Sequence, residues 1–213
     1  MRAAVVYQKG SMPVYVEDFP EPVINDKDEL LMSVKASAIK HLDKSRAGGK
    51  HYSSETNAMQ QPKVVGGDGV GLLEDGTRVF AFGITGMIAE KALIDKTRMV
   101  KLPESIDDIT AAALPNAVAG SAMALLFRAG MQAGETVLIN GATGFTGRVA
   151  VQVAKYYGAK RIIVTGRNEE SLQSLLALGA DEIISLKQGD ETLVAQLKAV
   201  HAGVPVDVVI DYL

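Results

Sequence analysis

The sequence predicts an α/β protein of two domains, a β-rich domain over residues 1–113 and an incomplete, doubly wound parallel sheet over residues 114–213. Three observations predict this fold class. Short segments with strand character, separated by Gly and Pro turns, fill the first part and are typical of a barrel or sandwich. Apolar strands alternate with amphipathic helices in the second part, which favours a parallel sheet. A glycine-rich turn joins the first strand and the first helix of this second part.

The first domain contains six segments with strand character. They cover residues 2–7, 14–18, 29–38, 63–73, 77–82 and 87–94. Because turn residues such as Pro20 and Gly76 separate them, we expect mostly antiparallel pairing. The polar stretch 40–58 predicts a short helix and a loop. A longer helix is expected over residues 106–129, with a break near Pro115, because proline lacks the backbone donor that a helix interior needs.

The second domain contains four apolar segments with strand character. They cover residues 137–140, 161–165, 182–185 and 206–211. Helices with apolar faces, marked by residues such as Val149 and Val153, are expected between them. Gly158 and Gly179 occupy positions where helices end, and Asp190 a position where one begins. A complete sheet of this class has six strands, so we expect this one to be truncated.

The glycine-rich turn is the strongest functional signal in the sequence. It consists of Gly141, Ala142, Thr143, Gly144, Phe145, Thr146 and Gly147. In a strand–turn–helix unit, such a turn presents backbone N–H groups and the positive end of the helix to a diphosphate. A side chain at Gly144 would fill space that the ligand needs, and one at Gly147 would keep the helix from its strand. The pattern departs from G-x-G-x-x-G at Ala142, and a purely structural tight turn is the alternative.

The residues that follow the second strand favour NADPH over NADH. An NAD site usually has an acidic residue at the end of this strand, which binds the ribose 2′-hydroxyl. Here the strand leads into Gly166, Arg167 and Asn168, and the first acid is Glu169. Gly166 leaves room, and the planar guanidinium of Arg167 suits a 2′-phosphate. Alternatively, Arg167 is a solvated residue before a helix that Asn168 caps.

Composition excludes several other classes of function. The 22 basic and 25 acidic residues give a net charge of −3, so we expect neither a nucleic-acid nor a membrane partner. No run of about 18 apolar residues exists, and residues 1–7 have strand rather than signal-peptide character, so we expect a cytoplasmic protein. Cysteine is absent, which excludes disulfides, thiol catalysis and cysteine-ligated zinc. The three histidines show no ligand spacing, and we expect no metal site.

The order of motifs along the chain resembles one known family. A strand-rich domain leads through Leu102-Pro-Glu-Ser and Ala111-Ala-Ala-Leu-Pro into the segment 134–144, and Leu178-Gly-Ala-Asp and Val206-Asp-Val-Val follow. This order resembles the zinc-independent quinone oxidoreductases of the medium-chain dehydrogenase/reductase superfamily. The resemblance implies a GroES-like catalytic domain, a Rossmann domain, and NADPH in the cleft between them. It also implies a longer chain than this one, and commonly a homodimer formed through the Rossmann sheet edge.

The resemblance also implies a substrate class and site residues. The expected substrate is a small quinone or α,β-unsaturated carbonyl (enone), which accepts hydride from NADPH without zinc. We expect Lys40 to stabilise the oxyanion and Tyr52 to donate the proton, although either could be an ordinary solvated residue. Asn116 is expected either to contact the nicotinamide or to satisfy broken helix backbone. Asp211, at the end of a strand, is expected to contact the cofactor.

Three local features distinguish this chain from members of the superfamily. Zinc-dependent relatives have Gly-His-Glu where this chain has Gly66-Gly-Asp. Quinone reductases commonly have Asn-x-x-Asp where this chain has Lys40-His-Leu-Asp, and many have a tyrosine that Ser185-Leu-Lys lacks. Two alternative functions stay open. One is a non-catalytic NADPH-binding redox sensor or structural protein, and the other is a short-chain type of reductase, which the strand-rich first domain disfavours.

Overall fold

The computed structural model describes residues 1–8, 10–52, 61–187, 189–201 and 203–213. The chain divides into two compact units, Met1–Leu114 and Pro115–Leu213. This division lies one residue beyond the boundary that the sequence predicts.

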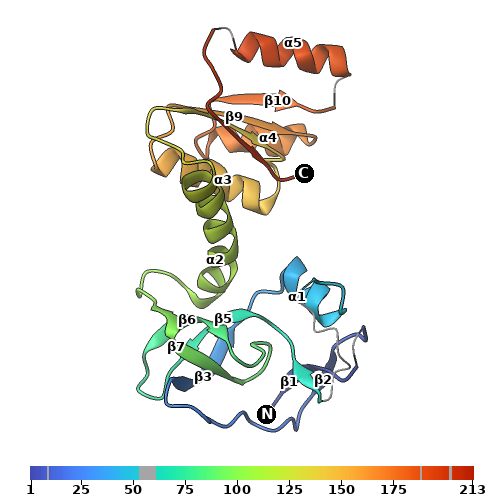
Figure 1. The fold of residues 1–213 in the computed structure, drawn as a ribbon, viewed down its shortest axis with the longest axis vertical. Coiled ribbons are helices and arrows are strands. Elements are labelled where there is room, and N and C mark those ends of the chain that lie inside the picture. Colours follow the sequence, from blue (N-terminus) through green and yellow to red (C-terminus); the bar gives the residue numbers. More distant parts are fainter. Residues whose placement is uncertain (9, 53–60, 188, 202) are drawn as a thin grey trace. The chain divides into compact units, whose positions relative to one another are not determined.

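The first unit is built around a closed antiparallel barrel (Figure 1). Its strands are β3 (Glu29–Ala36), β5 (Asp68–Leu72), β6 (Arg78–Gly83) and β7 (Lys91–Lys101). A second sheet, in the order β2-β1-β4, consists of β1 (Ala3–Val6), β2 (Val14–Val16) and β4 (Lys63–Val64). Apolar side chains that alternate along the barrel strands, such as those of Met32, Val79 and Ala81, fill the barrel and are fully buried. The predicted antiparallel, β-rich domain is therefore confirmed.

Two predicted strands of this unit differ from the observed ones. The predicted strand 63–73 is two strands in different sheets, β4 and β5. Gly66 lies between them with φ +100°, and a Cβ there would lie 2.8 Å from Ile88 Cγ1, so the chain turns at this glycine. The predicted strand 87–94 starts later, at Lys91, and runs on to Lys101.

The predicted helix break at Pro115 is wrong. Helix α2 (Asp108–Ala122) contains Pro115 in its interior and continues as the π-helical segment η1 (Met123–Arg128). Proline removes one hydrogen bond, but the alanine-rich turns on both sides have the highest helix propensity and maintain the helix. In the described part of the chain, Asp108–Arg128 is the one helix whose length and composition would allow it to cross a membrane, a test that core helices of soluble proteins also pass.

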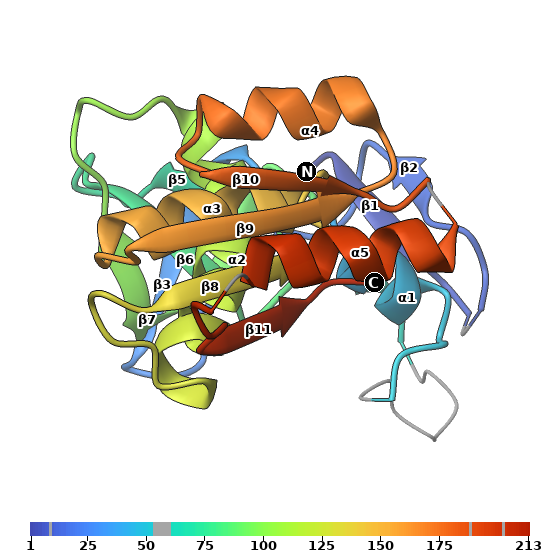
Figure 2. The same ribbon diagram turned by 90° about the horizontal axis from the view of Figure 1, so that it is seen from above.

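The second unit is a four-stranded parallel sheet in the order β10-β9-β8-β11. Its strands are β8 (Thr136–Asn140), β9 (Arg161–Gly166), β10 (Glu182–Ser185) and β11 (Val208–Asp211). The helices are α3 (Phe145–Tyr156), α4 (Glu169–Leu176) and α5 (Asp190–His201). Figures 1 and 2 show α3 and α4 on one face of the sheet and α5 on the other. This arrangement confirms the doubly wound sheet.

The inner strands position the glycine-rich turn. Ile162, Ile163 and Val164 of β9 are all buried, as expected of a strand that helices cover on both faces. Ile139 of β8 pairs with Val164 on one side and with Ile210 on the other. The carboxyl end of β8, where the glycine-rich turn starts, therefore lies between the carboxyl ends of β9 and β11.

Local capping signals in this unit agree with the sequence in most places. Gly158 and Gly179 follow α3 and α4 with φ +86° and +110°, the left-handed conformation that glycine adopts at helix ends. Asn168 caps α4, because its side chain accepts a hydrogen bond from the backbone N–H of Ser171. Asp190 is the first residue of α5 rather than its cap.

Candidate functional site

The turn between β8 and α3 holds its shape through backbone interactions. Gly141 starts the turn with φ +73°, and the N–H of Ala142 donates to the carbonyl of Thr165 at 3.0 Å, which ties the turn to the end of β9. Gly144 is the N-cap residue of α3 and, being glycine, provides no side-chain cap for this helix end. The backbone N–H groups of the first turn of α3 therefore have no competing side-chain acceptor from the cap position.

Two glycines of this turn have opposite surroundings. A Cβ at Gly147 would lie 2.5 Å from Ala142 Cα and 2.8 Å from the carbonyl oxygen of Gly141. A Cβ at Gly144 would have one neighbour within 4 Å, the carbonyl oxygen of Gly141 at 3.8 Å. Gly147 thus allows α3 to pack against the turn, while Gly144 leaves open space in front of the helix N-terminus. This open cradle fits the diphosphate of a dinucleotide.

Gly166 has a packing role that its sequence position did not reveal. A Cβ at Gly166 would lie 2.5 Å from Thr143 Cγ2 and 3.3 Å from Leu172 Cδ2. The space that the sequence assigns to a ligand is therefore filled by Thr143 of the turn. The glycine lets the end of β9 approach the turn, so both segments form one edge of the site.

Arg167 and Asn168 come directly after β9, at the same carboxyl edge of the sheet as the turn. Arg167 is exposed, and the Oδ1 atom of Asn168 accepts the backbone N–H of Ser171 at 2.8 Å. The first carboxylate after β9 belongs to Glu169, within α4. The end of β9 therefore has a cation and no acid before the helix, as predicted from the sequence.

A polar network joins the ends of three strands. Asn140 Nδ2 donates to Asp211 Oδ1 at 3.0 Å, and the hydroxyl of Thr165 donates to Asn140 Oδ1. Asp211 Oδ1 also accepts the backbone N–H of Leu213 at 3.0 Å. Asp211 was predicted to contact the cofactor, which stays a prediction, whereas no role was predicted for Asn140 and Thr165. Their only sequence signal is a polar residue at the end of an apolar strand.

A second connection runs from α2 to the start of α3. Ser121 is fully buried, and its hydroxyl donates to the carbonyl of Thr146 at 3.2 Å. The Tyr212 hydroxyl donates to Ser121 Oγ at 3.4 Å. Ser121 of α2 thus contacts the start of α3, and no role was predicted for it from the sequence. The predicted Asn116 is exposed. Because α2 is continuous through Pro115, the premise that Asn116 satisfies a broken helix no longer holds.

In the first unit, Lys40 lies at the start of helix α1 (His41–Ala47) and is not an ordinary solvated residue. Its ammonium forms an ion pair with Asp68 of β5, and the two side chains are 13% and 6% exposed. Its backbone N–H donates to Asp43 Oδ2 at 2.8 Å, and the N–H of Gly67 donates to Asp43 Oδ1 at 3.0 Å. Burial raises the pKa of the Asp68 carboxyl, and the Lys40 ammonium opposes this rise.

Tyr52 is in a different environment from Lys40. Its side chain is 95% exposed, and its ring centroid lies 4.2 Å from that of His51. Within the described ranges, the structure does not bring Tyr52 into contact with Lys40. The same ranges contain no group of three or more His, Cys, Asp or Glu side chains that could hold a metal ion.

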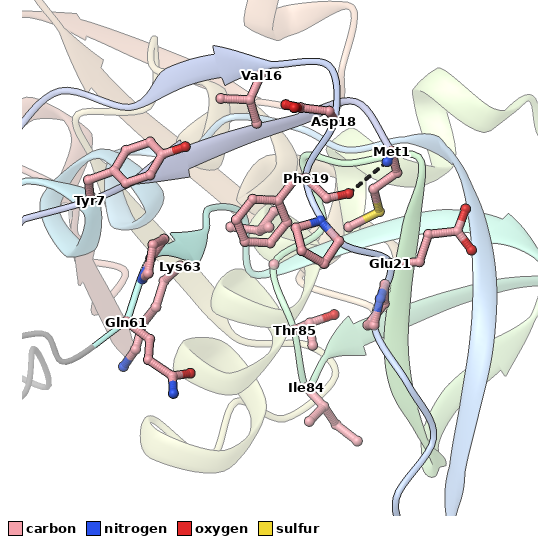
Figure 3. Close-up of a pocket in the computed structure, with 15 residues that line it drawn as sticks. Met1, Tyr7, Val16, Asp18, Phe19, Glu21, Gln61, Lys63, Ile84 and Thr85 are labelled. Atoms are coloured by element: carbon pink, nitrogen blue, oxygen red, sulfur yellow. Dashed lines mark hydrogen bonds between the residues drawn. The ribbon is translucent and has the colours of Figure 1, made fainter.

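The first unit also contains a cavity of about 770 Å³, and none of the predicted site residues lines it (Figure 3). Phe19, Tyr7, Lys63 and Ile84 are among the residues that line it. The amino group of Met1 donates to the carbonyl of Phe19 at 2.7 Å and fixes this part of the wall.

Comparisons with known proteins agree with this geometry. Residues 146–213 match the family model of zinc-binding dehydrogenases. Human quinone oxidoreductase is 30% identical over all of this chain and 66% of its own length. The probable NADPH-dependent quinone reductase tdiC of Emericella nidulans is 31% identical over 84% of this chain and 58% of its own length. The chain thus spans about three fifths to two thirds of these curated relatives.

A solved structure extends the likeness to three dimensions. The quinone oxidoreductase of Thermus thermophilus, also solved in complex with NADPH, has a TM-score of 0.79 at 26% identity. The match covers all of this chain and 80% of that protein.

Proposed function

This chain belongs to the quinone oxidoreductase family of the medium-chain dehydrogenase/reductase superfamily, and from that premise we propose that it is an NADPH-dependent oxidoreductase that reduces a quinone or an enone without zinc. The observation that carries the proposal is the open cradle at Gly144, beside the closely packed Gly147. The names of the Emericella relative and of the Thermus structure, which both include NADPH, support this choice of cofactor.

In this proposal, the second unit binds the cofactor. The N–H groups at the start of α3 hold the diphosphate, and the residues involved are Gly141, Ala142, Thr143, Gly144, Phe145, Thr146 and Gly147. Arg167 binds the 2′-phosphate through its planar donors, with Gly166 and Asn168 shaping the edge beside it. Asn116 and Asp211 complete the proposed contacts. When bound, NADPH would supply a hydride to the acceptor and would itself become NADP⁺.

The first unit supplies groups for the acceptor. Lys40 donates a hydrogen bond to the carbonyl oxygen on which negative charge develops, and Tyr52 donates the proton that completes the two-electron reduction. Zinc independence rests on the donor set, because the chain has no cysteine and has Gly67 where zinc-dependent relatives have histidine. We include a homodimer and a cytoplasmic location as further parts of the proposal.

Steady-state oxidation of NADPH with a panel of quinones and enones tests this function. We expect turnover with at least one acceptor, retained after treatment with a zinc chelator, and tighter binding of NADPH than of NADH in calorimetry. NADPH binding without turnover of any acceptor would instead support the alternative, a non-catalytic redox sensor or structural protein. Light scattering in solution measures the oligomeric state.

A further inference from the structure

The ion pair between Lys40 and Asp68 joins the start of α1 to the start of β5 inside the first unit. Both side chains are largely withdrawn from water, and a buried charge is retained at low cost only where a partner neutralises it. Lys40 was predicted from the sequence to stabilise the oxyanion, whereas no role was predicted for Asp68. We propose that Asp68 is a positioning residue of the reductase site, which holds the Lys40 ammonium charged and aimed at the acceptor oxygen. This inference rests on the role proposed above for Lys40.

The backbone on both sides of the pair is fixed. Asp43, itself buried, accepts the N–H groups of Lys40 and Gly67 with its two carboxylate oxygens, at 2.8 Å and 3.0 Å. The Ser37 hydroxyl donates to the carbonyl oxygen of Asp68 at 2.8 Å. Lys40 and Asp68 therefore start from two backbone segments that cannot move apart without breaking these bonds. Because the pair is already held in one arrangement, it loses little conformational entropy when a substrate binds.

The donor count of Lys40 leaves one position for a substrate. An ammonium group has three N–H donors. One is directed to Asp68 and one to the carbonyl of Ala38 at 3.2 Å. In the described part of the chain, the third has no acceptor, so it can donate to a carbonyl oxygen. Without Asp68, the Lys40 ammonium would lose the carboxylate that neutralises it, and its rotamers would be less restricted.

The charges around the pair are consistent with this role. Asp43 is the other acid that acts on Asp68, and it raises the pKa of Asp68, as burial does more strongly. Arg46 of α1 lies on the same side, since a Cβ at Gly67 would be 3.3 Å from Asp43 Oδ1 and 3.9 Å from Arg46 Nη1. Protonation of Asp68 at low pH would remove the partner of Lys40, so we expect turnover to fall on the acidic side.

The first test does not require activity. The protein is treated with a limiting amount of isotopically labelled acetic anhydride. Mass spectrometry then measures the rate of acetylation of Lys40 in the wild type and in Asp68→Asn. We expect labelling of Lys40 to rise about fivefold or more in the variant, because its amino group is no longer held in the ion pair with the Asp68 carboxylate. Lys91 and Lys96, which pair with Glu21 and Asp28 at the surface, serve as internal references.

Two outcomes of the labelling test would overturn the inference. One is an unchanged rate at Lys40 in Asp68→Asn. The other is an equal rise at Lys44, on the same helix, because that would indicate a loosened α1 rather than a lost partner.

The second test is a double-mutant cycle with Lys40→Met and Asp68→Asn. We expect Asp68→Asn to lower kcat about tenfold in the wild type, and to change it less than about twofold in the Lys40→Met background. The KM for NADPH stays within about twofold throughout. The double variant removes both buried charges together and is expected to fold, since replacing both members of a buried pair is often tolerated.

Asp108→Asn is the matched control, because it removes an acid from another ion pair of this unit, with Arg78. An equal kcat loss from Asp68→Asn in both backgrounds would show a merely structural role and overturn the inference. If no acceptor is turned over, the proposed function fails, while the labelling test still decides whether Asp68 holds Lys40. If turnover occurs and labelling is unchanged, only this inference fails.

Discussion

Gly144 and Gly147 lie in the same turn, yet each lacks a side chain for a different reason. The space beside Gly147 is taken by the backbone of Ala142, whereas the space beside Gly144 is open. A sequence pattern treats both positions alike, because both are glycine. The structure separates them into a packing residue and a residue that keeps a ligand surface clear, and this separation has consequences for mutants.

Replacing Gly144 with Asp should change stability and binding in opposite directions. Its φ of −72° accommodates any residue, and aspartate is a favourable N-cap, so thermal stability should be maintained or increased. The same carboxylate occupies the cradle and repels a diphosphate, so the Kd for NADPH should rise about tenfold or more. Calorimetric titration and thermal unfolding measure the two effects. Gly144→Asn is the uncharged control, with an intermediate loss. NADPH affinity equal to that of the wild type in Gly144→Asp would contradict the cradle.

The exposed guanidinium of Arg167 predicts a selective effect. Arg167→Ala should raise the Kd for NADPH about tenfold, on the order of 1.4 kcal/mol, and leave NADH binding unchanged, because only NADPH carries the 2′-phosphate. Arg128→Ala, which removes an exposed cation from η1 in the same unit, controls for a general loss of charge. Equal losses for the two cofactors in Arg167→Ala would argue against the 2′-phosphate role.

At the scale of elements, α2 shows what a local pattern can and cannot predict. Its approximate extent followed from its apolar and alanine-rich sequence, but its continuity through Pro115 did not. The penalty of proline at one position is offset by the helix propensity of the alanine-rich turns around it, whereas the tertiary contacts of α2 involve residues far along the chain. The bond between Ser121 of α2 and Thr146, at the start of α3, is one such contact.

The N-terminus of α2 predicts a pH-dependent stability. Asp107 accepts hydrogen bonds from the backbone N–H and the hydroxyl of Thr110, at 2.8 Å and 2.7 Å, and these bonds lower the pKa of Asp107. A lowered folded-state pKa contributes stability above the ordinary Asp value of about 3.9, and this contribution is lost as pH falls through the folded value. Asp107→Ala should therefore lower Tm by a few degrees at pH 7, and by less at pH 3. A Tm difference that grows toward pH 3 would contradict this assignment.

At the scale of the whole molecule, the fold class could be predicted because its signals are local. Strand and helix periodicity, glycine caps and the glycine-rich turn each lie within a few residues of the chain. The ion pair of Lys40 with Asp68 joins residues 28 positions apart, and the bond of Tyr212 to Ser121 spans 91 positions. No periodicity encodes which distant residue meets which. This is why the turn was recognised, whereas Asp68, Ser121 and Asn140 were missed.

The division into two units predicts where the cofactor acts on stability. The turn, Arg167 and Asp211 all lie in Pro115–Leu213, so NADPH should stabilise chiefly that unit. Ligand at 100 times its Kd adds about 2.7 kcal/mol to the unit that binds it. We expect calorimetry to resolve two transitions, of which NADPH raises one.

Core variants assign the two transitions. Ile139→Ala removes a fully buried side chain beneath the turn and should lower the transition that NADPH raises, at a cost of about 2–5 kcal/mol. Val79→Ala, in the barrel core, should lower the other transition. The contradicting outcome is that NADPH raises the temperature of the transition that Val79→Ala lowers and does not change the transition that Ile139→Ala lowers. In that case the β8–α3 turn could not be the main cofactor-binding element. A single transition that both variants lower would instead mean that the two units unfold together, since the continuous helix through Leu114 and Pro115 joins them.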